Sequence, residues 1–315
     1  MSDLPLQYRN PGPSWGYALL TKAQRIAPRW LLWLPLAIVT WVAVAWLPVQ
    51  RRHSCAFFNI VLGRRATMLD VWRHFFAYLE FLLIRLRIAD GVPPKCRLEP
   101  ENAAEFETLV RSSEPALFGT FHFGHSDLLG FLLSTRGRHV AIVRLRVANS
   151  GDTELLERQF RRAVRFIWVN EPENLLFAMK DALDRGDSLA MQCDRLFSSR
   201  TEPFEFLGER RIFPFAIYHL AILFNRPVIF CVGLPDGPAG TRVVPSPIFR
   251  VKESASREEN LSVARLHFQK VLARLEALVR EFPYLWFNFL PLNPVAGPAG
   301  SKIPAPGHVP SGPCR

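Results

Sequence analysis

The stretch ALFGTFHFGHSDLLGFLL, residues 116–133, predicts a buried strand, a turn and then a helix. The short apolar run Ala116–Phe121 is typical of a strand inside a sheet. Further strand patterns lie at Val140–Val143, Phe166–Val169, Ser188–Gln192 and Val228–Leu234. Helix patterns lie at Asp127–Leu133, Asp152–Val164, Pro172–Arg185, Phe215–Phe224 and Arg257–Phe282. This alternation predicts an α/β fold with a mostly parallel central sheet flanked by helices.

An apolar run, WLLWLPLAIVTWVAVAWL, covers residues 30–47 near the N-terminus. Eighteen uncharged residues are just long enough to cross a bilayer as a helix, and tryptophan is favoured at the membrane interface. Basic residues flank both ends, so the orientation stays open, as does the choice between a span and a shallow re-entrant anchor. The alternative is a buried core helix. We expect a membrane anchor region at 1–55, a catalytic domain at 56–290 and a disordered Pro/Gly-rich tail at 291–315.

A second helical stripe runs over Met68–Leu86, with apolar side chains at helical spacing. Such a stripe is usually core. Arg73, Arg85 and Arg87 are predicted to lie on its exposed counterface, where they could also contact an anionic membrane.

The chain of 315 residues carries a formal charge of +11, which predicts attraction to polyanions. Nucleic acid, an anionic membrane and an acidic carrier protein are all open on charge alone. We find no Gly-rich phosphate loop and no RNA-binding aromatic signature, so nucleic acid is the weakest of the three. The five cysteines are scattered without a CxxC pair, which fits a reducing cytoplasmic setting.

His122 and Asp127 are the main candidate catalytic residues. His122 directly follows the first strand of the predicted sheet, at the carboxyl end where ligands gather in such folds. A turn could fold Asp127 back onto the imidazole. The carboxylate would then fix the tautomer, while the other ring nitrogen takes a proton from an attacking hydroxyl or amine. The competing interpretation is a packed histidine followed by a helix N-cap.

Two other chemistries use the same segment. Gly124-His125-Ser126 resembles the start of a hydrolase nucleophile elbow, but Leu128 stands where the pattern needs glycine. His122, His125 and Asp127 could also be metal ligands, although no further His or Cys cluster completes a zinc set. The sequence therefore predicts no metal and no cofactor.

Asp194 and Arg195 end the strand pattern Ser188–Gln192 at the same predicted edge as His122. Arg195 could grip a phosphate or carboxylate bidentately, with Asp194 orienting it, although a surface ion pair is the alternative. Further arginines, among them Arg144 and Arg146, flank these strands and could receive an acidic carrier protein.

Taken in order, several motifs resemble the lysophospholipid acyltransferase superfamily, and above all its bacterial branch of lipid A lauroyl and myristoyl acyltransferases. They are His122-x4-Asp127, Cys193-Asp194-Arg195, Phe204–Gly208 with Phe213-Pro214, Asn225–Val228, and Phe282–Phe287. The similarity covers roughly residues 14–290. Asp127 replaces the glutamate common in that branch.

The resemblance implies direct acyl transfer from acyl carrier protein or coenzyme A to a membrane lipid acceptor, without a covalent enzyme intermediate. The catalytic roles carry over onto His122 and Asp127, and substrate binding onto Arg195. Its substrate-binding neighbours are predicted to be Arg146, Asp194, Phe213 and Pro214. The expected location is the cell inner membrane with the active site facing the cytoplasm. The alternative function is a membrane-associated lipid hydrolase or thioesterase that uses the same histidine.

Overall fold

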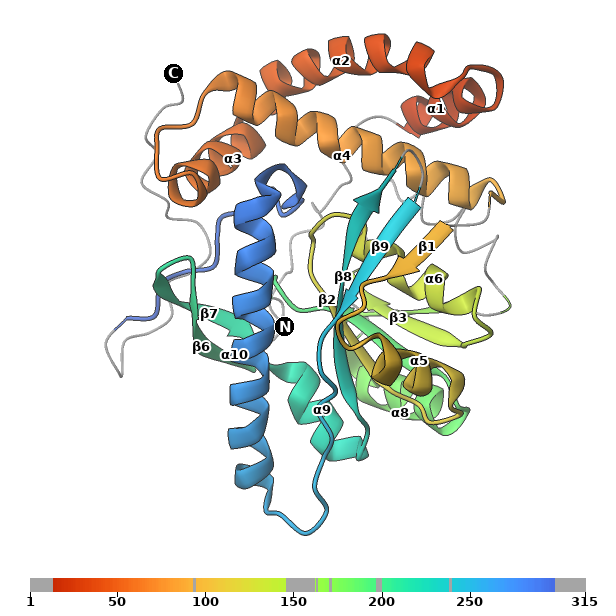
Figure 1. Ribbon diagram of the computed structural model, residues 1–315, viewed down its shortest axis with the longest axis vertical. Helices are drawn as coiled ribbons and strands as arrows, with labels where there is room; N and C mark the ends of the chain where they lie inside the picture. The colour runs from red at the N-terminus through yellow and green to blue at the C-terminus, as the bar shows by residue number, and fades with distance from the viewer. Residues whose placement is uncertain are drawn as a thin grey trace.

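A seven-stranded sheet forms the centre of the molecule (Figure 1). The computed structural model describes residues 14–92, 95–145, 162, 164–169, 172–196, 200–237 and 240–297. The strands of the sheet are β1 (Lys95–Leu98), β2 (Leu117–Thr120), β3 (Val140–Arg144), β4 (Val164–Trp168), β5 (Ser188–Gln192), β8 (Val228–Asp236) and β9 (Gly240–Pro245). Their order is β1-β9-β8-β2-β5-β3-β4, and every pairing is parallel except that of β8 with β9. The predicted α/β fold with a mostly parallel sheet is confirmed.

Helices bury both faces of this sheet. Neighbouring residues of a strand point to opposite faces, so Leu117 joins one hydrophobic cluster and Phe118 the other. The first face packs against α8 (Leu175–Asp184), α9 (Ala216–Phe224) and α10 (Arg257–Glu281). The second packs against α5 (Ala103–Arg111) and α6 (Leu129–Ser134), which follows the 3₁₀ turn η1 (Ser126–Leu128). Burial on both sides explains why these strands appear in the sequence as continuous apolar runs.

A separate hairpin, β6 (Thr201–Phe206) and β7 (Glu209–Pro214), was not among the predicted strands. Its two-residue loop, Leu207-Gly208, has positive φ at both positions, as tight hairpin turns require. The backbone N–H of Ile212 donates to the carbonyl of Pro294 at 3.0 Å, so the start of the predicted tail lies against β7. Residues 298–315 of that tail lie outside the described residues, as does most of the predicted helix Asp152–Val164.

The four N-terminal helices form a layer at one end of the molecule, with α4 between α2 and the sheet (Figure 1). They are α1 (Ser14–Ile26), α2 (Arg29–Trp46), α3 (Pro48–Val61) and α4 (Met68–Ala89). A capping box starts α4, since the Thr67 side chain accepts from the N–H of Asp70 and the Asp70 carboxylate accepts from the N–H of Thr67. In Figure 1 the arrowhead of β8 points toward α4, so this layer lies at the carboxyl end of the parallel strands.

The predicted anchor, residues 30–47, becomes helix α2 and does not continue into a straight span. No single helix in the described part of the chain is long and apolar enough to cross a membrane. The segments Leu31–Trp46 and Pro48–Val61 meet that requirement only as a pair, and they bend by 96° where they join. Pro48 occupies the first turn of α3, where its missing N–H is tolerated.

Helix α2 has one covered face and one bare face. Its covered side chains follow at four-residue intervals, namely Leu32, Leu36, Thr40 and Val44. Leu36 packs with Phe76 of α4, and the indole N–H of Trp72 donates to the carbonyl of Ala37 at 3.3 Å. The bare face consists of Leu31, Leu34, Ile38, Val39, Val42 and Trp46. Trp33 and Trp41 are half exposed, and their rings contact Phe76 and Trp72 of α4. An apolar surface of this extent on one helix is typical of a site that meets a membrane or another protein.

Candidate active site

His122 and Asp194 form a hydrogen-bonded pair at the carboxyl edge of the sheet. The Nδ1 atom of His122 lies 2.8 Å from Oδ1 of Asp194, and the backbone N–H of His122 donates to Oδ2 at 3.1 Å. The strand register explains the encounter. Thr120 of β2 pairs with Gln192 of β5, so His122 and Asp194 each lie two residues beyond the same rung.

The environment of this pair keeps His122 neutral near pH 7. Burial and the charge of Arg195 lower the pKa of His122 below its ordinary value, against the opposing carboxylates of Asp194 and Asp127. Burial alone would raise the pKa of Asp194, yet the interactions with His122 and Arg195 bring it below the usual range. A neutral imidazole beside an ionised carboxylate is the resting state of a general base. Since Asp194 occupies Nδ1, a proton from a substrate would go to Nε2.

Asp127 lies near the pair, but its carboxylate is held by other side chains. Its Oδ2 atom is 3.0 Å from Nη1 of Arg85, and Gln192 donates to its Oδ1 at 3.5 Å. The prediction that Asp127 folds back to hold the imidazole is therefore wrong in geometry, because Asp194 holds Nδ1. Asp127 still acts on His122 through its charge.

The turn between His122 and Asp127 is fastened to β8. Gly124 has a φ of +53°, and a Cβ atom there would lie 2.2 Å from the carbonyl oxygen of Gly233. The N–H of His125 donates to that same carbonyl at 2.8 Å. Only glycine permits this approach, so the spacing between His122 and Asp127 is fixed by the turn.

Ser126 and His125 have structural roles. The hydroxyl of Ser126 is buried, donates to the carbonyl of Phe123 at 2.6 Å and accepts from the N–H of Gly233 at 2.9 Å. A serine engaged in this way is poorly placed as a nucleophile. The Nδ1 atom of His125 lies 2.8 Å from the Thr241 hydroxyl, and its ring stacks on a phenylalanine of α4.

Arg195 is hydrogen-bonded to Asn288. Its Nε donates to Oδ1 of Asn288 at 3.2 Å, and Asn288 itself is buried. The segment that carries Asn288 crosses the His122 turn, since the N–H of Phe287 donates to the carbonyl of His122 at 2.7 Å. The segment Phe287-Asn288 thus holds both the His122 turn and the guanidinium of Arg195 in place. Asn288 was missed in the sequence, where no pattern marked it.

The remaining predicted site residues are placed differently. Phe213 lies in the core with its ring 5.3 Å from Phe206, and Pro214 ends β7 opposite Thr201. Both have packing roles here, so their contact with a substrate stays a prediction. Arg146 lies outside the described residues. No group of three His, Cys, Asp or Glu side chains suited to a metal ion occurs in the described part of the chain.

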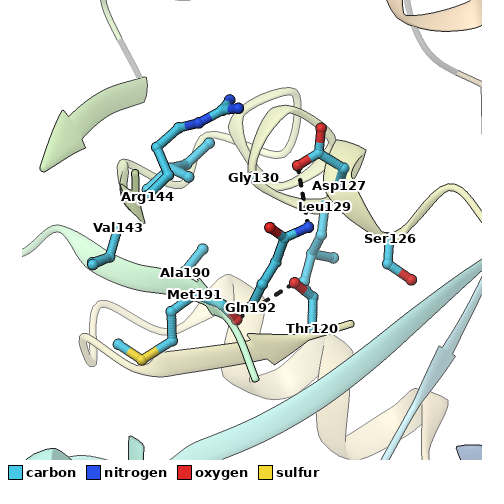
Figure 2. Close-up of a pocket in the computed structure, with 11 residues that line it drawn as sticks. Thr120, Ser126, Asp127, Leu129, Gly130, Val143, Arg144, Ala190, Met191 and Gln192 are labelled. Carbon is cyan, nitrogen blue, oxygen red and sulfur yellow. Dashed lines mark hydrogen bonds between the residues drawn. The ribbon is translucent and has the colours of Figure 1, made fainter. Parts of the chain in front are cut away.

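A shallow hollow, open to solvent, lies between α6 and the ends of β3 and β5 (Figure 2). Its lining combines an apolar floor with a polar rim. The residues are Leu129, Gly130, Ile142, Val143, Ala190 and Met191 on the floor, and Thr120, Ser126, Asp127, Arg144 and Gln192 around it. Figure 2 shows the Gln192 amide pointing at the Asp127 carboxylate, with the Arg144 guanidinium extending along the same rim. The lining thus brings one carboxylate and one guanidinium together beside apolar side chains.

We compared the chain with known proteins. No protein-family model matches it, and no curated protein matches it. Among solved structures it is similar to the 1-acyl-sn-glycerophosphate (LPA) acyltransferase PlsC from Thermotoga maritima, with 14% sequence identity and a TM-score of 0.38. That alignment covers 79% of this chain and 98% of the other.

Proposed function

We propose that this protein is a membrane-associated acyltransferase that moves a fatty acyl chain from a thioester donor to a hydroxyl or amine of a lipid acceptor. The observation that carries the proposal is the hydrogen bond between His122 and Asp194 beside a hollow lined by apolar side chains, Asp127 and Arg144. The order of the sequence motifs, which resembles that of the lysophospholipid acyltransferases, supports acyl transfer as the reaction.

The proposed step needs no covalent enzyme intermediate. Nε2 of His122 takes the proton of the acceptor hydroxyl as its oxygen attacks the thioester carbonyl carbon. The new C–O bond forms, the C–S bond breaks, and the thiolate leaves with the proton that His122 returns. Asp194 stabilises the imidazolium that exists between these two proton transfers.

The charges around the site support an anionic substrate. Arg85, Arg144 and Arg195 all lie close enough to lower the pKa of Asp127, against its burial, which would raise it. These three arginines put positive charge beside the carboxylate of Asp127. A donor carried by acyl carrier protein or coenzyme A, or an acceptor with a phosphate like a lipid A precursor, supplies matching negative charge.

The bare face of α2 supports an attachment to the membrane, which we place at the cytoplasmic leaflet of the inner membrane. A helix with one face packed on α4 and the other apolar and exposed suits a position in the plane of the interface rather than across it. The acceptor lipid then reaches the site from the same interfacial region of the membrane in which α2 lies.

The first prediction tests the reaction itself. We expect the purified full-length protein in mixed micelles to transfer a labelled acyl group from acyl carrier protein or coenzyme A to a lysophospholipid or a lipid A precursor. Each donor is combined with each acceptor, and mass spectrometry of the lipid product identifies the pair that reacts. Release of free fatty acid at the same rate with and without acceptor would instead support the hydrolase or thioesterase.

The second prediction tests the membrane face. Changing Leu34 and Ile38 to glutamate together should weaken binding to anionic vesicles by roughly 100-fold or more, since each buried leucine-sized side chain contributes about 1.5–3 kcal/mol and 1.4 kcal/mol is a factor of about ten. Flotation with vesicles measures the bound fraction. Leu266→Glu on α10 is a matched control, because Leu266 is 66% exposed and Leu34 is 69% exposed. Equal binding of all three proteins would exclude α2 as the anchor.

A further inference from the structure

Arg85 of α4 is a buried cation at the edge of the site. Only 9% of its side chain is exposed, and its Nη1 lies 3.0 Å from Oδ2 of Asp127, which is 25% exposed. Its guanidinium carbon also lies 5.8 Å from the centre of the Phe81 ring, one turn earlier on α4. The sequence placed Arg85 on an exposed counterface, and that prediction is wrong because this face of α4 covers the sheet edge.

Helix α4 lies between the membrane face and the site. On one side, Phe76 and Leu83 pack with Leu36 of α2. On the other side, Phe81 stacks on His125 of the His122 turn at 5.5 Å, and Arg85 contacts Asp127. The helix therefore touches the turn at two points, one aromatic and one ionic.

We propose that Arg85 is a positioning residue, which fixes the Asp127 carboxylate at the rim of the hollow and offsets its charge beside His122. This inference rests on the proposed function for its catalytic consequence, although the ionic contact stands without it. Arg85 would thus influence the charge of His122 from α4, which lies outside the motif from His122 to Asp127.

The carboxylate of Asp127 has several charged neighbours. The charged groups that act on Asp127 are Arg85, Arg144, Arg195 and His122, and Arg85 is the cation with the largest effect. Gln192 contacts the other carboxylate oxygen at 3.5 Å. Without Arg85, one carboxylate oxygen of Asp127 loses its charged partner and the carboxylate can rotate away from its present position.

Loss of Arg85 should also change the protonation of His122. The groups that act on this imidazole are Arg195, Asp194 and Asp127, and the two carboxylates favour its charged form. Removing the cation that offsets Asp127 strengthens that preference, so the pKa of His122 rises. A base is active only when it is neutral, so activity would begin to fall at a higher pH than in the unmodified protein.

The third prediction compares Arg85→Gln, Arg85→Lys and the control Arg87→Gln on the same helix. We expect kcat of Arg85→Gln to fall roughly 10- to 100-fold, with a smaller loss for Arg85→Lys, which keeps the charge but not the planar fork. Arg87→Gln should leave kcat unchanged. The acid limb of the pH–rate profile should move to higher pH in Arg85→Gln alone.

A double-variant cycle decides whether Arg85 acts through Asp127. If it does, Arg85→Gln combined with Asp127→Asn is no slower than Asp127→Asn alone. Multiplied losses, or a lower melting temperature with unchanged kinetics and pH profile, overturn the proposal. NMR titration of His122 in labelled protein reads its pKa without any turnover. If the pKa of His122 rises in Arg85→Gln but neither the unmodified protein nor any variant transfers an acyl group, the proposed function is refuted and the positioning role of Arg85 is kept.

Discussion

Replacing His122 by alanine is expected to lower acyl transfer by on the order of 10²–10⁴-fold, the usual contribution of a general base. His122 is the imidazole that Asp194 holds through Nδ1, and its side chain is still 18% exposed toward a substrate. Binding of the donor should change little, because the arginines of the site remain. The measurement is single-turnover transfer at saturating donor, with donor affinity measured separately.

The control for this variant is Ser126→Ala in the same turn. Its buried hydroxyl makes two hydrogen bonds, so its removal should cost about 1–3 kcal/mol of unfolding free energy and leave most of the activity. The opposite pattern, with His122→Ala active and an acyl group trapped on Ser126, would replace direct transfer by a covalent serine mechanism.

The pH profile gives the same assignment an independent check. Because burial and Arg195 lower the pKa of His122, the base stays neutral below the ordinary histidine value of about 6.5. Activity should therefore hold as the pH falls to 6.5 and decline only below it. An acid limb centred well above 6.5 would mean that a different group, or a more exposed histidine, titrates.

Most of the sheet could be predicted because burial on both faces leaves a strong sequence signal. The runs at Ala116–Phe121 and Ser188–Gln192 stand out because each is short and mostly apolar. The strands β1 and β9 and the hairpin β6–β7 were not predicted. Strand β1 alternates exposed and partly buried positions and pairs with β9, about 145 residues later, while the hairpin carries charged side chains at its exposed positions.

The shared position of His122 and Asp194 at one edge of the sheet could be predicted, but the hydrogen bond between them could not. Parallel strands bring their carboxyl ends together, which placed His122 and Asp194 at the same edge. The register of β2 with β5 decides which carboxylate reaches the imidazole ring of His122. That register cannot be read from a single sequence. Asp127 was the nearer candidate along the chain. In three dimensions it turns toward Arg85, a residue 42 positions earlier.

Asp194→Asn is the other variant for which a large loss of activity is expected. Asparagine has nearly the same shape, but its amide can donate to Nδ1 and so leave the proton on Nε2, the nitrogen that must accept from the substrate. It also cannot stabilise the imidazolium. We expect turnover to fall by on the order of 10²–10⁴-fold, comparable to His122→Ala.

Asp127→Asn is the matched comparison, since both variants remove one carboxylate charge close to the same imidazole. We expect a smaller loss for Asp127→Asn, because the hydrogen bond between Nδ1 and Asp194 is intact and only a more distant charge is gone. Nitrogen NMR shifts of His122 should report the changed tautomer in Asp194→Asn alone. A greater loss for Asp127→Asn, with the tautomer unchanged in both, would make Asp127 the catalytic partner that the H-x4-D spacing first suggested. The bond to Asp194 would then be only a structural restraint on the turn.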